Sequence, residues 1–465
     1  MRYVSTRGSA PERDFTGVLL AGLAEDGGLY MPESWPHLSP SDLRAMRGLS
    51  YPEIAARVMH PFVGATMPQE ELLALCRDAY AGFDHPAVAP LVQLETDLWA
   101  LELFHGPTLA FKDMAMQLLG RLFDRVLAQQ DRRITIVGAT SGDTGSAAIE
   151  ACRDRSQLDV VILHPLGRTS EVQRRQMTTV RSPNIANIAV EGTFDDCQDL
   201  VKAMFADVPF RRDLRLSAVN SINWARVAAQ IPYYVAAAVA LGSPDREVAF
   251  SVPTGNFGNV LAAWAARRMG VPIARLIVGS NRNDILTRFL RDNDMSARTV
   301  EPSLSPSMDI QVSSNFERLL FELLDRDPAA TTSAMQQFRQ AGRMPVPDAA
   351  WHRARTLFHG FRLDDAATTA EIRRLHGQGY LADPHSAIGI AAARALSSPH
   401  VPTIAAATAH PAKFPDAMEE ATGQRPPLPP RLADLYERPE HYLTAPADLG
   451  AVEAQVRAFT LRNAA

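Results

Sequence analysis

The sequence predicts an α/β fold of parallel sheets with helices on both faces, behind a mostly helical N-terminal region. From about residue 95 onward, short apolar runs alternate with helical stretches. Residues 1–85 instead show helical patterns interrupted by proline-rich breaks. Strands that alternate with helices pair in parallel, because each helix carries the chain back across the sheet. Ligands of such sheets bind at the carboxyl ends of the strands, so the loops that follow the strands are the informative places.

The individual elements follow from the same pattern. Short apolar runs predict strands at 133–138, 160–164, 185–190, 248–252, 274–278 and 403–407. Amphipathic or apolar stretches predict helices at 146–152, 195–205, 227–241 and 260–269. The proline-rich stretch at 420–432 predicts an exposed connector.

The chain is too long for one hydrophobic core. It has 465 residues, of which 46% are apolar, whereas single cores stop growing at roughly 250–300 residues. We expect an N-terminal domain over residues 1–85, an α/β region over 95–435 and a helical C-terminal extension over 436–465.

Composition argues against several classes of partner. The net charge of -5 does not favour nucleic acid or an anionic membrane as a partner, because both select basic surfaces. The apolar stretch at 227–241 is shorter than the roughly 20 residues that span a bilayer, and the N-terminus lacks a secretory pattern. The three cysteines, Cys76, Cys152 and Cys197, form no pairing pattern, and the histidines show no metal-ligand spacing. We therefore expect a cytoplasmic protein without a metal site.

Lys112 is the first candidate for chemistry. It lies in LELFHGPTLAFKD at 101–113, at the start of a predicted helix and after the bend at Gly106-Pro107. An amine attacks a carbonyl only when it is deprotonated, and the apolar neighbours Ala110 and Phe111 favour that state. From this segment alone, a solvent-facing lysine remains the simpler interpretation.

Two glycine-rich loops follow predicted strands. GATSGDTG at 138–145 and PTGNFGN at 253–259 both lead into helices, where backbone N–H groups attract anions. Neither matches the dinucleotide pattern GxGxxG or the nucleotide P-loop, which favours a smaller phosphate or carboxylate ligand. Each loop taken alone could also be an ordinary turn. A third loop, TAHPAKF at 408–414, places the Thr408 hydroxyl at the end of a strand, and we interpret His410 beside it as structural.

Eight segments in this order resemble the threonine synthase family, of the bacterial and fungal branch, among pyridoxal-phosphate enzymes of the tryptophan-synthase-β fold (fold type II). They are GLAEDGGLYMP (22–32), HGPTLAFKD (105–113), ATSGDTGSA (139–147), NSINWAR (220–226), PTGNFGN (253–259), SSNFERLL (313–320), DPHSAIG (383–389) and TAHPAKF (408–414). The resemblance runs from about residue 1 to about residue 435. It implies that residues 95–435 form two α/β subdomains with the cofactor between them.

The resemblance also implies a reaction and its residues. O-phospho-L-homoserine and water would become L-threonine and phosphate by γ-elimination and β-hydration. Lys112 would bind pyridoxal 5'-phosphate covalently and move protons, and Thr408 would hydrogen-bond the pyridine nitrogen. The cofactor phosphate would be held by Gly255, Asn256, Phe257, Gly258 and Asn259. The substrate carboxylate would meet Ser141, Gly142, Asp143 and Thr144. Candidates for the substrate phosphate are Thr108, Ser221, Asn223, Arg226 and Lys413, because such an anion favours cations and hydroxyls.

Other readings remain open at this stage. A serine/threonine dehydratase, or a phospho-lyase acting on O-phosphothreonine, would share the fold. A non-catalytic regulatory protein on this scaffold would be expected to lack the lysine or the phosphate loop, and a nucleotide-binding module would be expected to have one of the missing patterns. The expected assembly is a monomer or a homodimer.

Overall fold

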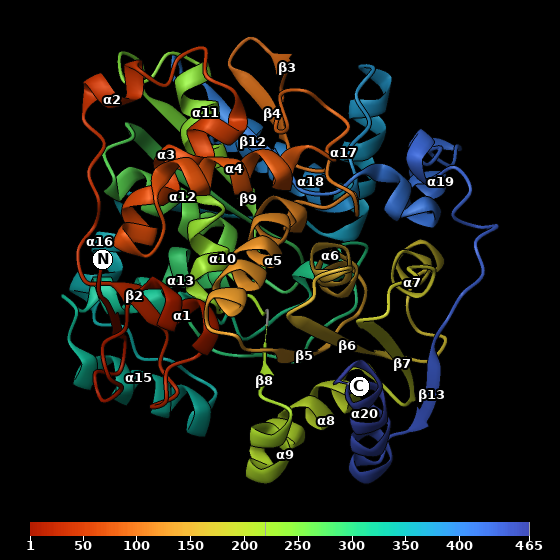
Figure 1. The fold of residues 1–465 in the computed structure, drawn as a ribbon. Coiled ribbons are helices and arrows are strands. Elements are labelled where there is room, and N and C mark those ends of the chain that lie inside the picture. The colour runs from red at the N-terminus through yellow and green to blue at the C-terminus, as the bar shows by residue number, and fades with distance from the viewer. Residues whose placement is uncertain (219, 465) are drawn as a thin grey trace. The chain divides into compact units, whose positions relative to one another are not determined.

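The computed structural model describes residues 1–218 and 220–464, and the chain divides into two compact units. The larger unit contains residues 1–19, 23–106 and 221–426, and the smaller unit contains residues 20–22, 107–220 and 427–465. Each unit has its own principal sheet, and most of the strands and helices are labelled in Figure 1. The predicted division into three domains, at 1–85, 95–435 and 436–465, stays a prediction.

The larger unit is built on a six-stranded sheet. Its strands, in spatial order, are β11 (Phe358–Arg362), β10 (Ile273–Ser280), β9 (Val248–Pro253), β12 (Thr403–Ala407), β4 (Leu98–Glu102) and β3 (Leu91–Glu95). All neighbours are parallel except β3, which runs antiparallel to β4. The central strands β9 and β12 are buried along their whole length, which explains their largely apolar sequences. Because they are parallel neighbours, the loops at 253–259 and 408–414 begin at the same edge of this sheet.

The N-terminal region is mostly helical, as predicted, and it also contains a short strand pair. β1 (Tyr3–Ser5) pairs antiparallel with β2 (Tyr30–Pro32). The helices are α1 (Phe15–Ala21), α2 (Pro40–Arg44), α3 (Tyr51–Val63) and α4 (Gln69–Tyr80), with the 3-10 turn η1 (Gly64–Thr66). α2 begins where Ser39 and Asp42 cap each other's backbone N–H groups.

The remaining helices of the larger unit surround its sheet. They are α12 (Gly258–Arg268), α13 (Ile285–Asp292), α14 (Phe316–Leu323), α15 (Pro328–Ala341), α16 (Asp348–Arg355), α17 (Asp365–Gly377), α18 (Pro384–Leu396) and α19 (Pro415–Thr422), with 3-10 turns η2 (Pro306–Met308) and η3 (Pro411–Lys413). The helix predicted at 227–241 is two helices, α10 (Trp224–Ala228) and α11 (Ile231–Ala240). Pro232 lies in the first turn of α11, where a proline starts a helix but cannot continue the preceding one.

The smaller unit is built on a five-stranded parallel sheet. Its strands, in spatial order, are β13 (Leu443–Pro446), β7 (Ile185–Glu191), β6 (Leu158–Pro165), β5 (Ile134–Ala139) and β8 (Leu216–Ser217). The helices are α5 (Lys112–Gln129), α6 (Asp143–Cys152), α7 (Glu171–Thr178), α8 (Phe194–Ala206), α9 (Val208–Asp213) and α20 (Leu449–Ala464), with the 3-10 turn η4 (Pro430–Leu432). Residues 436–465 were predicted to be a helical extension, but they also supply β13 to this sheet.

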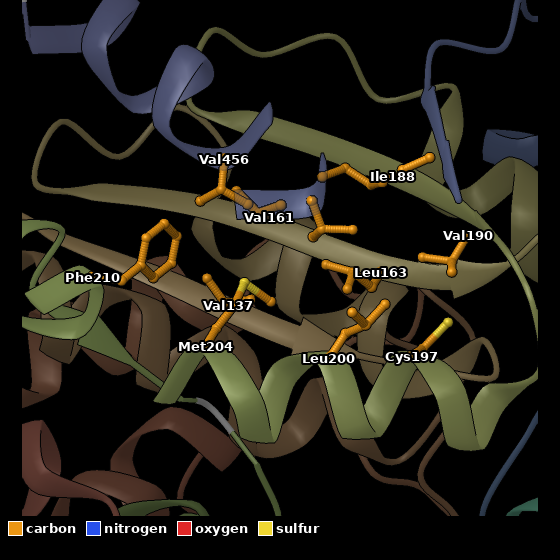
Figure 2. Packing of buried hydrophobic residues seen from close by; sticks show 12 residues of the cluster. Val137, Val161, Leu163, Ile188, Val190, Cys197, Leu200, Met204, Phe210 and Val456 are labelled. Carbon is orange, nitrogen blue, oxygen red and sulfur yellow. The ribbon is translucent and has the colours of Figure 1, made fainter. Parts of the chain in front are cut away.

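Helices cover both faces of this smaller sheet. In Figure 1, α8, α9 and α20 lie on one side of its strands, and α5, α6 and α7 lie on the other. Figure 2 shows the apolar cluster between the strands and α8, in which Leu200 and Met204 meet Val161 and Leu163. The sequence prediction of parallel α/β sheets with helices on both faces is confirmed.

Two features that bear on partners can be read from the described residues. None of their helices is both long and apolar enough to cross a bilayer. No cluster of three histidine, cysteine, aspartate or glutamate side chains within residues 1–218 and 220–464 is placed to hold a metal ion.

Candidate active site

Lys112 is the first residue of α5 and contacts an acid. Its Nζ lies 2.9 Å from Asp143 Oδ2, and the side chains of Lys112 and Asp143 are only 11% and 6% exposed. The predicted apolar setting is present in part, since Ala110 is buried and the Phe111 ring centroid lies 5.5 Å from Nζ. The sequence interpretation missed the carboxylate, which favours the charged amine rather than the neutral one.

Asp143 is itself held in place by a second residue. Gln173 on α7 donates from Nε2 to Asp143 Oδ1 at 2.8 Å, which leaves Oδ2 facing Lys112. A Cβ added at Gly142 would lie 2.5 Å from Gln173 Cδ, and Gly142 has φ +149°, so only glycine lets Gln173 reach Asp143.

The loop at 139–145 is shaped by Thr140. Its Oγ1 accepts hydrogen bonds from the N–H groups of Gly142 at 3.0 Å and Gly145 at 2.9 Å. A side chain at Gly145 would collide with Thr140 Cγ2, at 2.4 Å from the added Cβ. Ser141 is exposed and Thr144 is half-buried, in the first turn of α6. The loop thus presents a hydroxyl and a helix N-terminus, which suit a carboxylate ligand.

Close packing of α5 on α6 fixes the spacing of Lys112 and Asp143. Each of these residues begins its helix. At Gly120 in α5, an added Cβ would lie 2.2 Å from the backbone oxygen of Ala151 in α6. The two helices therefore approach more closely than any side chain at Gly120 would permit.

Thr108 is less suited to the predicted role of substrate-phosphate ligand. It is buried, and its hydroxyl donates to Asp113 Oδ1 at 2.7 Å while its N–H donates to Asp113 Oδ2 at 2.8 Å. Gln176 Nε2 donates to its carbonyl at 3.1 Å. These bonds shape the bend before Lys112, in which Leu109 has φ +64°. The hydrogen-bonding groups of Thr108 thus serve to hold the start of α5.

The loop at 253–259 has the shape of an anion cradle. A Cβ at Gly255 would lie 2.8 Å from the Ser307 backbone oxygen, and one at Gly258 would lie 3.3 Å from Asn315 Nδ2. Phe257 between them has φ +64° and caps α12, and its ring packs against Phe316 at 5.6 Å between centroids. Glycine at both positions brings backbone N–H groups close to a ligand at a helix N-terminus.

Asn259 and Asn256 complete this loop. Asn259 Oδ1 accepts from both Tyr233 and Tyr234 hydroxyls at 2.5 Å, whereas its Nδ2 is buried without a hydrogen-bond partner among the described residues. Such an orphaned donor is costly, and a bound oxyanion would satisfy it. Asn256 Oδ1 accepts from Ser314 Oγ at 3.3 Å. The donors of this loop therefore fit a phosphate group.

Thr408 follows β12 and belongs to a buried polar network. Its N–H donates to Ser386 Oγ at 2.9 Å, and the Ser386 hydroxyl donates to Asp383, which is fully buried. Asp383 Oδ2 also lies 2.7 Å from His385 Nδ1, while His385 Nε2 accepts from the Ser307 N–H at 3.2 Å. His385 thus connects Asp383 on one side of its ring to the Ser307 backbone on the other. The network fixes the backbone that carries the Thr408 hydroxyl.

The remaining predicted substrate-phosphate residues differ in their surroundings. Asn223 is fully buried, and both ends of its side-chain amide are bonded within the fold. Nδ2 donates to Leu19 O at 2.9 Å, and Oδ1 accepts from Ala225 N at 3.0 Å. Arg226 is also buried, and desolvation lowers its pKa to about 10. Lys413, in η3, is fully buried.

Ser221 is the candidate that the structure links to the loop at 253–259. Its Oγ lies 3.5 Å from Ser314 Oγ, which in turn donates to Asn256. The structure also identifies residues to which sequence reasoning gave no role: Gln173, Asn315, Arg318, Asp383, Ser386 and His385. All but Gln173 lie in SSNFERLL or DPHSAIG, two segments noted only for their resemblance.

Comparison with known proteins agrees with this arrangement. Family models match along the chain: "Threonine synthase N terminus" at residues 2–80, "Pyridoxal-phosphate dependent enzyme" at 84–405 and "Threonine synthase, C-terminal" at 386–456. Threonine synthase of Pseudomonas aeruginosa is 54% identical over 98% of both chains.

Solved structures give the same result. The crystal structure of PLP-bound threonine synthase from Brucella melitensis is similar with a TM-score of 0.97 and 52% identity, over 99% of both chains. Yeast threonine synthase is similar with a TM-score of 0.94 and 36% identity, again over 99% of both chains. The chain therefore belongs to the threonine synthase family and is a pyridoxal-phosphate-dependent enzyme of fold type II.

Proposed function

We propose that this enzyme converts O-phospho-L-homoserine and water into L-threonine and phosphate. The observation that carries the proposal is Lys112 at the start of α5, a lysine only 11% exposed and paired with Asp143, in a chain that matches a threonine synthase over 98% of its length. The substrate carries an amine, a carboxylate and a phosphate. The described residues offer separate groups of donors for the carboxylate and for the phosphate.

The proposal assigns the cofactor to three groups of residues. Lys112 forms the covalent link to its aldehyde. The glycine-rich loop binds its phosphate, with the orphaned Asn259 Nδ2 as one donor and with Gly255, Asn256, Phe257 and Gly258 supplying the cradle. Thr408 offers its hydroxyl to the ring nitrogen. When bound, the cofactor supplies an electron sink for negative charge on the adjacent substrate carbon.

Lys112 and Asp143 form the proton-transfer pair of the proposal. Lys112 Nζ would take the proton from the α-carbon of the substrate and later return protons to the reacting carbons. Each transfer needs a base about 3 Å from its proton. Asp143 orients Nζ through their 2.9 Å contact and stabilises the ammonium after each transfer. Gln173 keeps the carboxylate turned toward the lysine.

Substrate binding follows from the charges of the remaining groups. We assign the substrate carboxylate to the loop of Ser141, Gly142, Asp143 and Thr144, through its hydroxyls and the N-terminus of α6. For the phosphate, the buried cations Arg226 and Lys413 and the Ser221 hydroxyl are better supported than Thr108 and Asn223, because the polar groups of the latter two serve the fold.

The setting of the enzyme is also a proposal. The three cysteines are free and buried, which is compatible with a reducing compartment, so we place the enzyme in the cytoplasm. We expect a monomer or a homodimer. Light scattering on the purified protein measures the mass and decides between these two states.

The decisive experiment combines a product assay with a lysine variant. Purified enzyme is incubated with O-phospho-L-homoserine while threonine, phosphate and 2-oxobutyrate are quantified. Threonine and phosphate in equal amounts support the proposal, and 2-oxobutyrate without threonine would assign a dehydratase instead.

Lys112→Ala should lose both threonine formation and the visible absorbance of the covalently bound cofactor. Lys202→Ala is the matched control, because Lys202 is an exposed lysine of the same unit that pairs with Asp199. It should behave as the wild type. A Lys112→Ala enzyme that keeps the absorbance would remove Lys112 from the proposal.

A further inference from the structure

Arg318 is a fully buried arginine, and no carboxylate among the described residues bonds to it directly. Its guanidinium donates to Tyr30 O at 3.0 Å, to Ile222 O at 2.5 Å and to Asn315 Oδ1, all of them neutral acceptors. Its Cζ also lies 5.6 Å from the centroid of the Trp224 ring. The planar fork of arginine bridges three separate segments of the larger unit, which the single ammonium of a lysine cannot do.

The neighbouring acid is occupied elsewhere. Glu317 accepts from Arg7 Nε at 3.0 Å and Nη2 at 2.9 Å, and from the Thr6 hydroxyl at 2.7 Å. Arg318 therefore depends on carbonyl dipoles and an aromatic face for its stabilisation. Burial lowers its pKa to about 9, which still leaves the side chain protonated at neutral pH. A buried cation of this kind is costly for folding alone, so a second role is worth seeking.

Asn315 connects Arg318 to both proposed phosphate sites. Its Oδ1 accepts from Arg318, and its Nδ2 donates to Ser221 O at 3.0 Å, at the start of the segment proposed to meet the substrate phosphate. Its backbone N–H donates to Asn256 O at 3.1 Å, within the loop proposed to hold the cofactor phosphate. A Cβ at Gly258 of that loop would lie 3.3 Å from Asn315 Nδ2, which is a tight contact. Asn315 thus bonds to both segments, through its side-chain amide to Ser221 and through its backbone N–H to Asn256, and Arg318 fixes the orientation of its side chain.

We propose that Arg318 is a positioning residue that holds the cofactor-phosphate loop and the 221–226 segment in one geometry through Asn315. The inference rests on the proposed function for the roles of these two segments. It predicts that loss of Arg318 weakens binding of the cofactor and of the phosphorylated substrate together. A purely structural role would instead lower thermal stability and leave both affinities near their wild-type values.

Arg326 provides a matched control. It anchors the same N-terminal region, because its Nη1 donates to Pro32 O at 3.1 Å and to Glu33 O at 2.6 Å. Its other donors bind Glu322 at 2.6–3.0 Å. The structure records no bond from Arg326 to Asn315 among the described residues. Arg326→Met therefore removes a comparable anchor without disturbing the link between the two phosphate sites.

The experiment compares Arg318→Lys, Arg318→Met, Asn315→Asp and Arg326→Met. Asn315→Asp covers the case in which the Arg318 variants fail to fold, since it keeps an acceptor for Arg318 but replaces the Nδ2 donor that faces Ser221 O. Three quantities are measured on each protein: the Tm of the holoenzyme, the Kd of pyridoxal 5'-phosphate for the apoenzyme, and KM for O-phospho-L-homoserine.

The Arg318 and Asn315 variants should raise Kd and KM together, each by roughly 10- to 100-fold, the scale of one lost hydrogen bond to a charged group. Arg326→Met should lower Tm and leave Kd and KM within about twofold. Lower Tm with wild-type Kd in Asn315→Asp and in every folded Arg318 variant would overturn the inference. If the wild type does not turn over O-phospho-L-homoserine, the proposed function fails, and the cofactor Kd alone still decides whether Arg318 positions the loop.

Discussion

Replacing Gly120 by alanine tests whether the close approach of α5 and α6 governs both stability and catalysis. Two effects of opposite sign compete at this position. Alanine is favoured over glycine in the middle of a helix by about 1 kcal/mol. The added Cβ, however, would lie 2.2 Å from Ala151 O and 2.8 Å from Ala151 C, both backbone atoms that no rotamer change can move.

The steric clash should outweigh the gain in helix propensity. Ordinary contact between carbon and oxygen needs more than 3 Å, so the helices must separate by about 1 Å, and overpacking of this kind costs about 1–3 kcal/mol or more. Because the obstacle is backbone, we expect the upper end of that range and a net loss of about 1–2 kcal/mol. The same displacement would lengthen the 2.9 Å contact between Lys112 and Asp143, so kcat should fall as well.

The assay is urea unfolding followed by circular dichroism, together with steady-state kinetics. Gly377→Ala is the control, because Gly377 is the last residue of α17 and an added Cβ there meets nothing within 4 Å. That variant should keep or slightly raise stability and leave kcat unchanged. A Gly120→Ala enzyme with wild-type stability and kcat would refute the role assigned to the close approach.

Two further predictions concern charges on α6. Asp143→Asn should reduce kcat about 10- to 100-fold with little change in Tm, because a hydrogen bond to a charged group contributes about 1.5–3 kcal/mol. An unchanged kcat in steady-state assays would contradict the role of Asp143. Burial raises the pKa of Glu150 to about 7, so the folded state favours its neutral form and stability falls as pH rises from about 4.5 through 7. Glu150→Gln should therefore raise Tm at pH 8, because it removes a loss of folding free energy of at most about 3 kcal/mol, while Tm at pH 5 changes little. An equal shift of Tm at both pH values would show that the titration of Glu150 is not the cause.

The strands β5, β6, β7, β9, β10 and β12 could be predicted from the sequence because their signal is local, whereas β3, β4, β8, β11 and β13 were not predicted. The runs that became β5, β9 and β12 are largely apolar segments bounded by glycine or polar loops, and each pattern suffices for its own element. The single helix predicted at 227–241 is divided for an equally local reason, because Pro232 in the first turn of α11 prevents the preceding helix from continuing.

Side-chain partners could not be predicted in this way. Asp143 lies 31 residues beyond Lys112, and nothing in either segment indicates that the two meet at 2.9 Å. The same limit applies to Thr108 and Asn223, whose polar groups look available in sequence but are bonded within the fold. Periodicity reports which face of an element is buried, whereas the acceptor of a buried donor depends on the packing of distant elements.

The order of the chain through the two units has a consequence for biosynthesis. β4, at residues 98–102, pairs with β12, at 403–407, so its sheet is incomplete until β12 has been synthesised. The unit that carries Lys112 likewise lacks an edge strand and a covering helix until residues 443–464 have been synthesised. Neither unit can complete its sheet on the ribosome until most of the polypeptide has been synthesised. Nascent chains of this enzyme therefore expose unfinished sheet edges for most of translation, which makes them natural clients of chaperones.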